Sequence, residues 1–144
     1  MFFNYSLQPF QIMHSELIME VQCIEHDLKV IFAFMRKGNP DKNFRIVEDM
    51  SLGEIINELR MLDNSDHNPD LSRSDYKLLH EIRELRNYWC HQCYIDFVYI
   101  ANSSERNIAF NEVYSDLKKD KERIHDLYRK LENFRIKEVE RYRR

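Results

Sequence analysis

The sequence predicts an all-α protein that folds as an up-and-down bundle of four or five helices. The chain has 144 residues but only two glycines and three prolines, which leaves little material for hairpin turns. Apolar residues recur at intervals of three and four along most of the chain, as they do on one face of a helix. With 43% hydrophobic residues, residues 1–144 have the size and composition of a single domain.

The first predicted helix runs from about Leu7 to Lys37. Its apolar stripe consists of Ile18, Val21, Ile24, Leu28, Ile31, Phe32 and Met35. Gly38 and Pro40 follow, and a glycine with a nearby proline commonly ends a helix. We expect a loop through Asn43 to lead to the next element.

The second and third helices begin at serines. Ser51 and Glu54 have the spacing of a capping box, and the polar run from Asp63 to Pro69 ends this short second helix. Ser72 or Ser74 caps the third helix, which we expect to continue to about Ala101. Its apolar stripe consists of Leu78, Leu79, Ile82, Leu85, Trp89 and Cys93.

Asn102 and Glu105 have the same capping spacing at the start of a fourth helix. Its apolar residues are Phe110, Val113, Tyr114, Leu117, Ile124, Tyr128, Leu131 and Phe134. Because neighbouring helices with short connections are usually antiparallel, we expect an antiparallel bundle.

Charge is unevenly distributed. The net charge of -3 argues against a protein that coats nucleic acid without specificity. Residues 118–144, however, contain eleven Lys or Arg and six Asp or Glu, whereas the preceding residues contain eleven Lys or Arg and nineteen Asp or Glu. The basic tail, about 135–144, is a solvated helix end, or it contacts RNA through Arg141, Arg143 and Arg144 or binds an acidic partner.

The sequence favours a cytoplasmic location. Its three cysteines form no disulfide framework, and the N-terminus lacks a basic segment followed by an apolar run and a cleavage site. No window approaches eighteen apolar residues, so we expect no membrane span.

The third predicted helix contains a polar strip of Arg86, Asn87, Cys90, His91 and Tyr94 beside its apolar stripe. Arginine and histidine are costly in a helix face that otherwise resembles core, unless something uses them. Arg86 and His91 stand about 140° apart on an ideal helix, whereas Asn87 and His91 share a face. Such a strip suits a groove or a dimer seam.

Arg86-Asn87 followed by His91 resembles the R-x4-6-H motif of the HEPN domain, the higher-eukaryote and prokaryote nucleotide-binding superfamily, in which a polar residue commonly follows the arginine. The family fold is a four- or five-helix bundle with the motif near the start of a late helix. The segment from Ser51 to Ile55 also resembles a short segment that precedes the motif in several HEPN groups.

This resemblance implies a metal-independent endoribonuclease that needs no cofactor and dimerises so that two motifs face each other. His91 would transfer a proton, Arg86 would hold the phosphate, and Asn87 would position it. We also expect Tyr94 to contact the substrate. Toxin and phage-defence roles follow from the same resemblance, as does an antitoxin of the nucleotidyltransferase type. One toxin subgroup has the pattern R-x4-H-x-Y. Tyr94 stands one residue later than the tyrosine of that pattern. This departure argues against placing the chain in that subgroup, and against modification of Tyr94 by such a partner.

Other interpretations stay open. Arg86 and His91 could bond across the bundle to acids such as Glu81, Glu84 or Asp96, Tyr94 could be ordinary packing, and the chain could be a catalytically silent HEPN-like module that binds a nucleotide, RNA or a partner protein. It could also be an unrelated helical adaptor. A metal or redox site at Cys90 and Cys93 is disfavoured, because structural zinc needs four ligands and the sequence offers no second pair.

Overall fold

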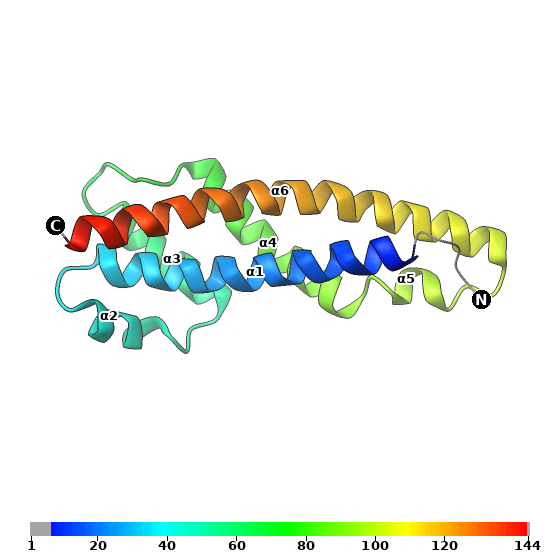
Figure 1. The fold of residues 1–144 in the computed structure, drawn as a ribbon, viewed down its shortest axis with the longest axis horizontal. Coiled ribbons are helices and arrows are strands. Elements are labelled where there is room, and N and C mark those ends of the chain that lie inside the picture. Colours follow the sequence, from blue (N-terminus) through cyan, green and yellow to red (C-terminus); the bar gives the residue numbers. More distant parts are fainter. Residues whose placement is uncertain (1–6, 144) are drawn as a thin grey trace.

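The structure, a computed structural model, describes residues 7–143 as a bundle of helices. These are α1 (Leu7–Met35), α2 (Pro40–Val47), α3 (Leu52–Asp63), α4 (Arg73–His91), α5 (Ile95–Val98) and α6 (Ser103–Arg143). The described residues contain no strand, and the all-α prediction is confirmed. Figure 1 shows that α1 and α6 lie side by side along most of the molecule.

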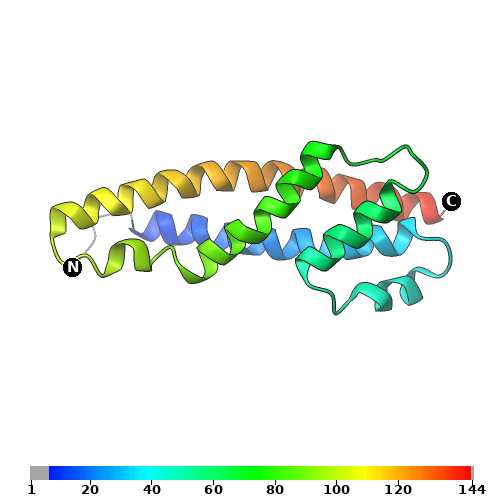
Figure 2. The same ribbon diagram turned by 180° about the vertical axis from the view of Figure 1, so that it is seen from behind.

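The two longest helices run in the same direction. The ring of Phe10 meets that of Phe110, and at the other end the ring of Phe34 meets that of Tyr142, so both helices advance together. The expectation that neighbouring helices are antiparallel is therefore wrong for this pair. Between them the chain goes back through α2, forward through α3 and back through α4 and α5 (Figure 2), which returns α6 to the direction of α1.

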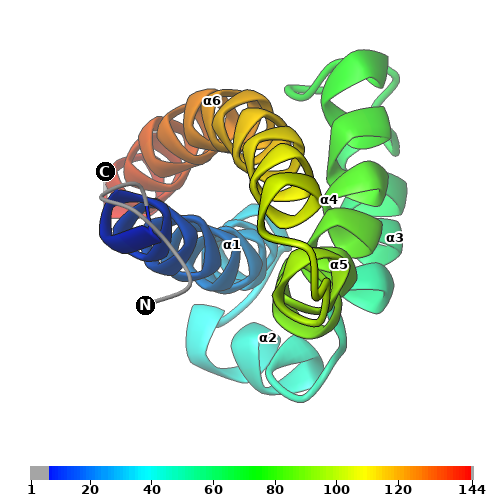
Figure 3. The same cartoon turned by 90° about the vertical axis from the view of Figure 1, so that its right-hand side faces the viewer.

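Viewed along the bundle, α1 and α6 form one pair, and α3, α4 and α5 lie to one side of it (Figure 3). The core between them is apolar, and its largest fully buried side chains include Trp89, Phe10 and Phe97. None of the described helices combines the length and the hydropathy that a membrane span requires.

Helix α2 occupies the region expected to be a loop. The side chain of Asn39 accepts a hydrogen bond from the backbone N–H of Lys42 at 3.1 Å, and Pro40 fills the first turn. Proline is a helix-start residue as well as a stop signal, because its missing N–H would be unpaired there anyway. The buried Asn43 then donates to the carbonyl oxygen of Ala33 at 3.0 Å and so joins α2 to the end of α1.

The expected helix starts are confirmed. Ser72, rather than Ser74, caps α4: its hydroxyl accepts from the backbone N–H of Asp75 at 3.1 Å, and the carboxylate of Asp75 accepts from the N–H of Ser72 at 2.9 Å. The corresponding single bonds join Ser51 to Glu54 at 3.2 Å and Asn102 to Glu105 at 3.0 Å.

Helix α4 ends at His91, and the expected continuation to about Ala101 is wrong. The backbone N–H groups of Gln92 and Cys93 both donate to the carbonyl oxygen of Tyr88, at 2.9 and 3.0 Å. Asp96 fixes the turn that follows by accepting from the hydroxyl of Tyr88 at 2.7 Å and from the side chain of Gln92 at 3.0 Å. Side-chain bonds thus end the helix, without a glycine or a proline, and the chain continues in the same direction into α5 (Figure 2).

Candidate functional site

The motif residues occupy the last two turns of α4. Asn87 and His91 are exposed, and Arg86 is half-buried. The HEPN resemblance placed the motif near the start of a late helix, whereas the structure places it at the end of α4. The structural reason is the turn held by Asp96, which ends the helix immediately after His91.

The side chains of Arg86, Asn87 and His91 form no hydrogen bond or ion pair within residues 7–143. Glu81 instead pairs with Arg123 on α6. Asp96 accepts hydrogen bonds from Gln92 and Tyr88. These two bonds, of which the bond from Gln92 has the larger effect, lower the pKa of Asp96. The interpretation that Arg86 and His91 bond across the bundle to these acids is therefore wrong.

Arg86 and His91 do not meet in one chain. About 140° of helix rotation separates them, as expected from their spacing. His91 stands on the exposed side of α4, whereas Arg86 lies on the flank toward the bundle. Within one chain the two side chains therefore leave α4 on different sides.

Tyr94 lies beyond the end of α4 and does not continue the polar strip. Its half-buried ring meets the ring of Phe10 edge-on at 5.6 Å and that of His14 at 5.4 Å between centroids. Burial raises the pKa of Tyr94. Packing therefore accounts for its position, and a substrate contact through Tyr94 stays a prediction.

Three residues that the sequence reasoning did not connect hold the motif in place. The Nε2 atom of His14 on α1 donates to the carbonyl oxygen of Trp89 at 2.6 Å, and the indole N–H of Trp89 donates to Asp120 on α6 at 3.0 Å. Burial raises the pKa of Asp120. The last turn of α4 is thus clamped between α1 and α6. No spacing in the sequence indicates these contacts, because they join distant helices.

An exposed apolar surface follows the motif directly. On and just after α5, Ile95 is 51% exposed, Val98 42% and Tyr99 82%. Isolated exposed apolar residues are ordinary, but a contiguous group marks an interaction surface. This group begins four residues after His91.

The basic tail lies far from the motif. Arg141 donates to Glu138 at 3.5 Å, Arg143 is exposed, and Arg144 lies outside the described residues. Trp89 contacts α6 at Asp120, so the position of Arg141 on that helix is about 30 Å further along. The structure does not bring the tail and His91 together within one chain.

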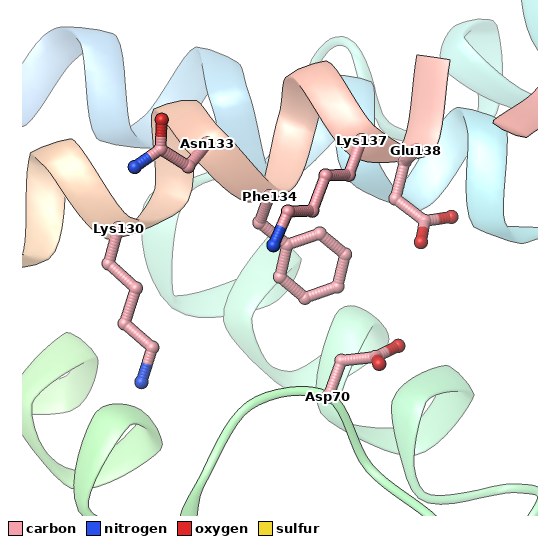
Figure 4. Close-up of a pocket in the computed structure, with 6 residues that line it drawn as sticks. All are labelled: Asp70, Lys130, Asn133, Phe134, Lys137 and Glu138. Atoms are coloured by element: carbon pink, nitrogen blue, oxygen red, sulfur yellow. The ribbon is translucent and has the colours of Figure 1, made fainter. Parts of the chain in front are cut away.

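A cleft of about 330 Å³ opens beside the C-terminal part of α6 (Figure 4). It is lined by Asp70, Lys130, Asn133, Phe134, Lys137 and Glu138. Burial raises the pKa of both Asp70 and Glu138. Lys130 is engaged by Asp75 at 2.6 Å. The cleft contains none of the proposed motif residues Arg86, Asn87 and His91.

The two cysteines near the motif differ in their surroundings. Cys90 is exposed, whereas Cys93 is buried and its thiol lies 3.4 Å from the carbonyl oxygen of Trp89. Burial raises the pKa of Cys93 to about 11, which keeps it a neutral thiol near pH 7 rather than the thiolate that binds metals. Within residues 7–143 no three His, Cys, Asp or Glu side chains are grouped as metal ligands.

No family model, curated protein or solved structure matches the chain. The likeness to HEPN domains consequently rests on the motif and on the helical architecture.

Proposed function

We propose that the chain is a metal-independent endoribonuclease of the HEPN type, which acts in the cytoplasm as a homodimer and serves as a toxin or as an effector of phage defence. One observation carries this proposal: Arg86, Asn87 and His91 have no partner among the described residues, although acids that could pair with them lie nearby. Arg86 is half-buried, but its guanidinium nitrogens are not sealed from solvent, so its charge stays available to a ligand.

The chemistry needs only side chains of this chain. His91 removes the proton from a ribose 2′-hydroxyl as that oxygen attacks the adjacent phosphorus, since imidazole titrates near neutral pH. The bond from phosphorus to the 5′-oxygen breaks, and the departing oxygen takes a proton from the His91 of the second chain. The products are a 2′,3′-cyclic phosphate and a 5′-hydroxyl. Arg86 stabilises the charge on the phosphorane with two parallel hydrogen bonds, and Asn87 positions it.

A two-fold dimer supplies the missing geometry. Because Arg86 and His91 of one chain lie on different sides of α4, a second copy is needed to complete the site. The exposed apolar residues Ile95, Val98 and Tyr99 follow His91 closely in the chain, and such a dimer would form on them.

Cleavage of a radiolabelled RNA in excess EDTA tests the proposal. The wild-type protein should cleave and leave 2′,3′-cyclic ends. Arg86→Ala should lower the rate by roughly two to four orders of magnitude, the range found when charge stabilisation or acid-base catalysis is lost. Arg86→Lys should also fail, since a point charge does not replace the planar fork. Loss of wild-type cleavage in EDTA would contradict the metal-free mechanism.

A catalytically silent binding module is the second candidate, and the separation of Arg86 from His91 within one chain favours it. In that case wild type and Arg86→Ala should both leave RNA intact, while binding of a nucleotide, RNA or a partner protein persists. A nucleotidyltransferase-like antitoxin is a proposed partner of the active form only.

A further inference from the structure

One side of α4 presents a continuous row of polar side chains to solvent. The row, called here the α4 row, consists of Arg73, Lys77, His80, Glu84, Asn87 and His91. Alternating steps of four and three residues keep its members on one side of a helix. Arg73 and His91 are the first and last of the 19 residues of α4, so about five turns and about 27 Å separate them on the same face.

The N-terminal half of the α4 row borders a groove of about 470 Å³. Its lining residues are Arg60 of α3 together with Arg73, Lys77, His80, Glu81 and Glu84 of α4. Arg73 and Lys77 form no ion pair within residues 7–143. Glu81 is neutralised by Arg123, and the guanidinium of Arg60 lies 5.7 Å above the ring of Tyr76. The groove therefore holds uncompensated positive charge in a protein whose net charge is -3.

Arg83 extends this charge toward the motif. The residue is exposed, forms no ion pair within the described chain, and lies against Gly53 at the start of α3. A Cβ atom at position 53 would stand 3.0 Å from Nη1 of Arg83. The glycine thus gives the guanidinium room to lie across α3, one turn before Asn87.

We propose that this groove binds the phosphate backbone of single-stranded RNA and leads it along the α4 row to His91. The inference rests on the proposed function, because it names the path by which the substrate reaches that site. The cations Arg60, Arg73 and Lys77 line the groove together with the acids Glu81 and Glu84. Glu81 is already paired with Arg123, which leaves the cations in excess. Cations that line a groove can follow one flexible backbone, as in other proteins that track a single strand. The groove, rather than the distant tail, then supplies the local positive charge.

Fluorescence anisotropy with a labelled single-stranded RNA tests the inference in the His91→Ala background, where the RNA stays intact. Replacing Arg60, Arg73 and Lys77 by Gln should weaken binding at least tenfold. The slope of log affinity against log salt concentration should fall by about two, because each lost phosphate contact on a single strand removes about 0.7. The matched control replaces Lys37, Lys42 and Arg45 by Gln. These cations are exposed near or on α2 and should change binding less than about twofold.

Arg60 also packs on Tyr76, so circular dichroism should check that the triple variant is folded. If it unfolds, the double variant at Arg73 and Lys77 replaces it in the binding assay. An unchanged salt slope, an equal loss in the α2 control, or no wild-type binding at low salt would overturn the inference. Competition by polyglutamate as strong as by RNA of equal charge would also overturn it, in favour of an acidic protein. Groove-dependent binding without wild-type cleavage would support the inference and defeat only the proposed function. Cleavage that survives full loss of groove charge would overturn the inference and leave the proposed function standing.

Discussion

Within residues 7–143, charged residues are paired in one region of the molecule and stand without a protein partner in another. Between α1 and α6, each buried acid has a basic partner: Glu20 contacts Lys121 at 3.0 Å and His125 at 2.7 Å, and Asp27 contacts Arg135 at 3.1 Å. At the end of α4, Arg86 and His91 have no such partner among the described residues.

The difference separates charges that the fold requires from charges that it leaves available. A buried acid must be paired, because the loss of hydration is otherwise uncompensated. The pairs between α1 and α6 therefore also set the register of the two longest helices. Exposed His91 has no such requirement, and half-buried Arg86 lacks a partner where one would stabilise the fold. A ligand phosphate would supply it.

Among the effects on assembly and stability, the largest is expected on assembly at the motif end. Tyr99→Glu places a charge on the exposed apolar group beside His91 and should raise the dimer dissociation constant about 100-fold, which corresponds to about 2.8 kcal/mol. Met61→Glu is the control, since Met61 is 68% exposed on α3, away from that group. Sedimentation equilibrium measures both. A wild-type monomer at micromolar concentration would contradict the two-fold assembly.

A smaller effect is expected when a paired charge is broken. Arg135→Met leaves Asp27, 2% exposed, without its partner and should lower the free energy of unfolding by about 2 kcal/mol. The estimate is below the usual cost because Arg135 is one-third exposed and because Asp27 can take up a proton. Arg129→Met, an exposed unpaired arginine on the same helix, should change it by less than about 0.5 kcal/mol. Urea unfolding compares them, and equal losses would contradict the distinction.

The pH dependence of stability should be smaller still. Burial raises the pKa of Asp27 and Asp120 above 3.8 in the folded state, so the folded protein binds protons more tightly than the unfolded chain. The free energy of unfolding should therefore fall as pH rises through the interval above 3.8. Asp27→Asn should flatten part of this dependence in a series of thermal melts that starts near pH 3.8 and ends at neutral pH. An identical slope in the variant would contradict the assignment.

Local signals predicted most of the helices. Apolar periodicity placed α1 and α6, and the caps at Ser51, Ser72 and Asn102 marked three helix starts within a residue or two. Two elements were missed for different reasons. Pro40 was interpreted only as a stop signal, although it also begins α2. The end of α4 depends on bonds to Asp96, which periodicity does not reveal.

The site was only partly predictable. The sequence pattern pointed to Arg86, Asn87 and His91 as candidates, and its spacing predicted different sides of α4 for Arg86 and His91, in line with their different exposure. The clamp of His14 on Trp89 and the groove shared by Arg60 with α4 join residues that are far apart in the chain. Such contacts exist only after the helices pack, so no single stretch of sequence shows them.

The most direct test compares one histidine from each region in the RNA cleavage assay. His91→Ala should lower cleavage by roughly two to four orders of magnitude and change the free energy of unfolding by less than about 0.5 kcal/mol. His125→Ala removes a partner of buried Glu20 and should lower the free energy of unfolding by about 1 kcal/mol, with cleavage within about twofold of wild type. Full cleavage by His91→Ala, or an equal loss of cleavage in a stable His125→Ala protein, would contradict the account.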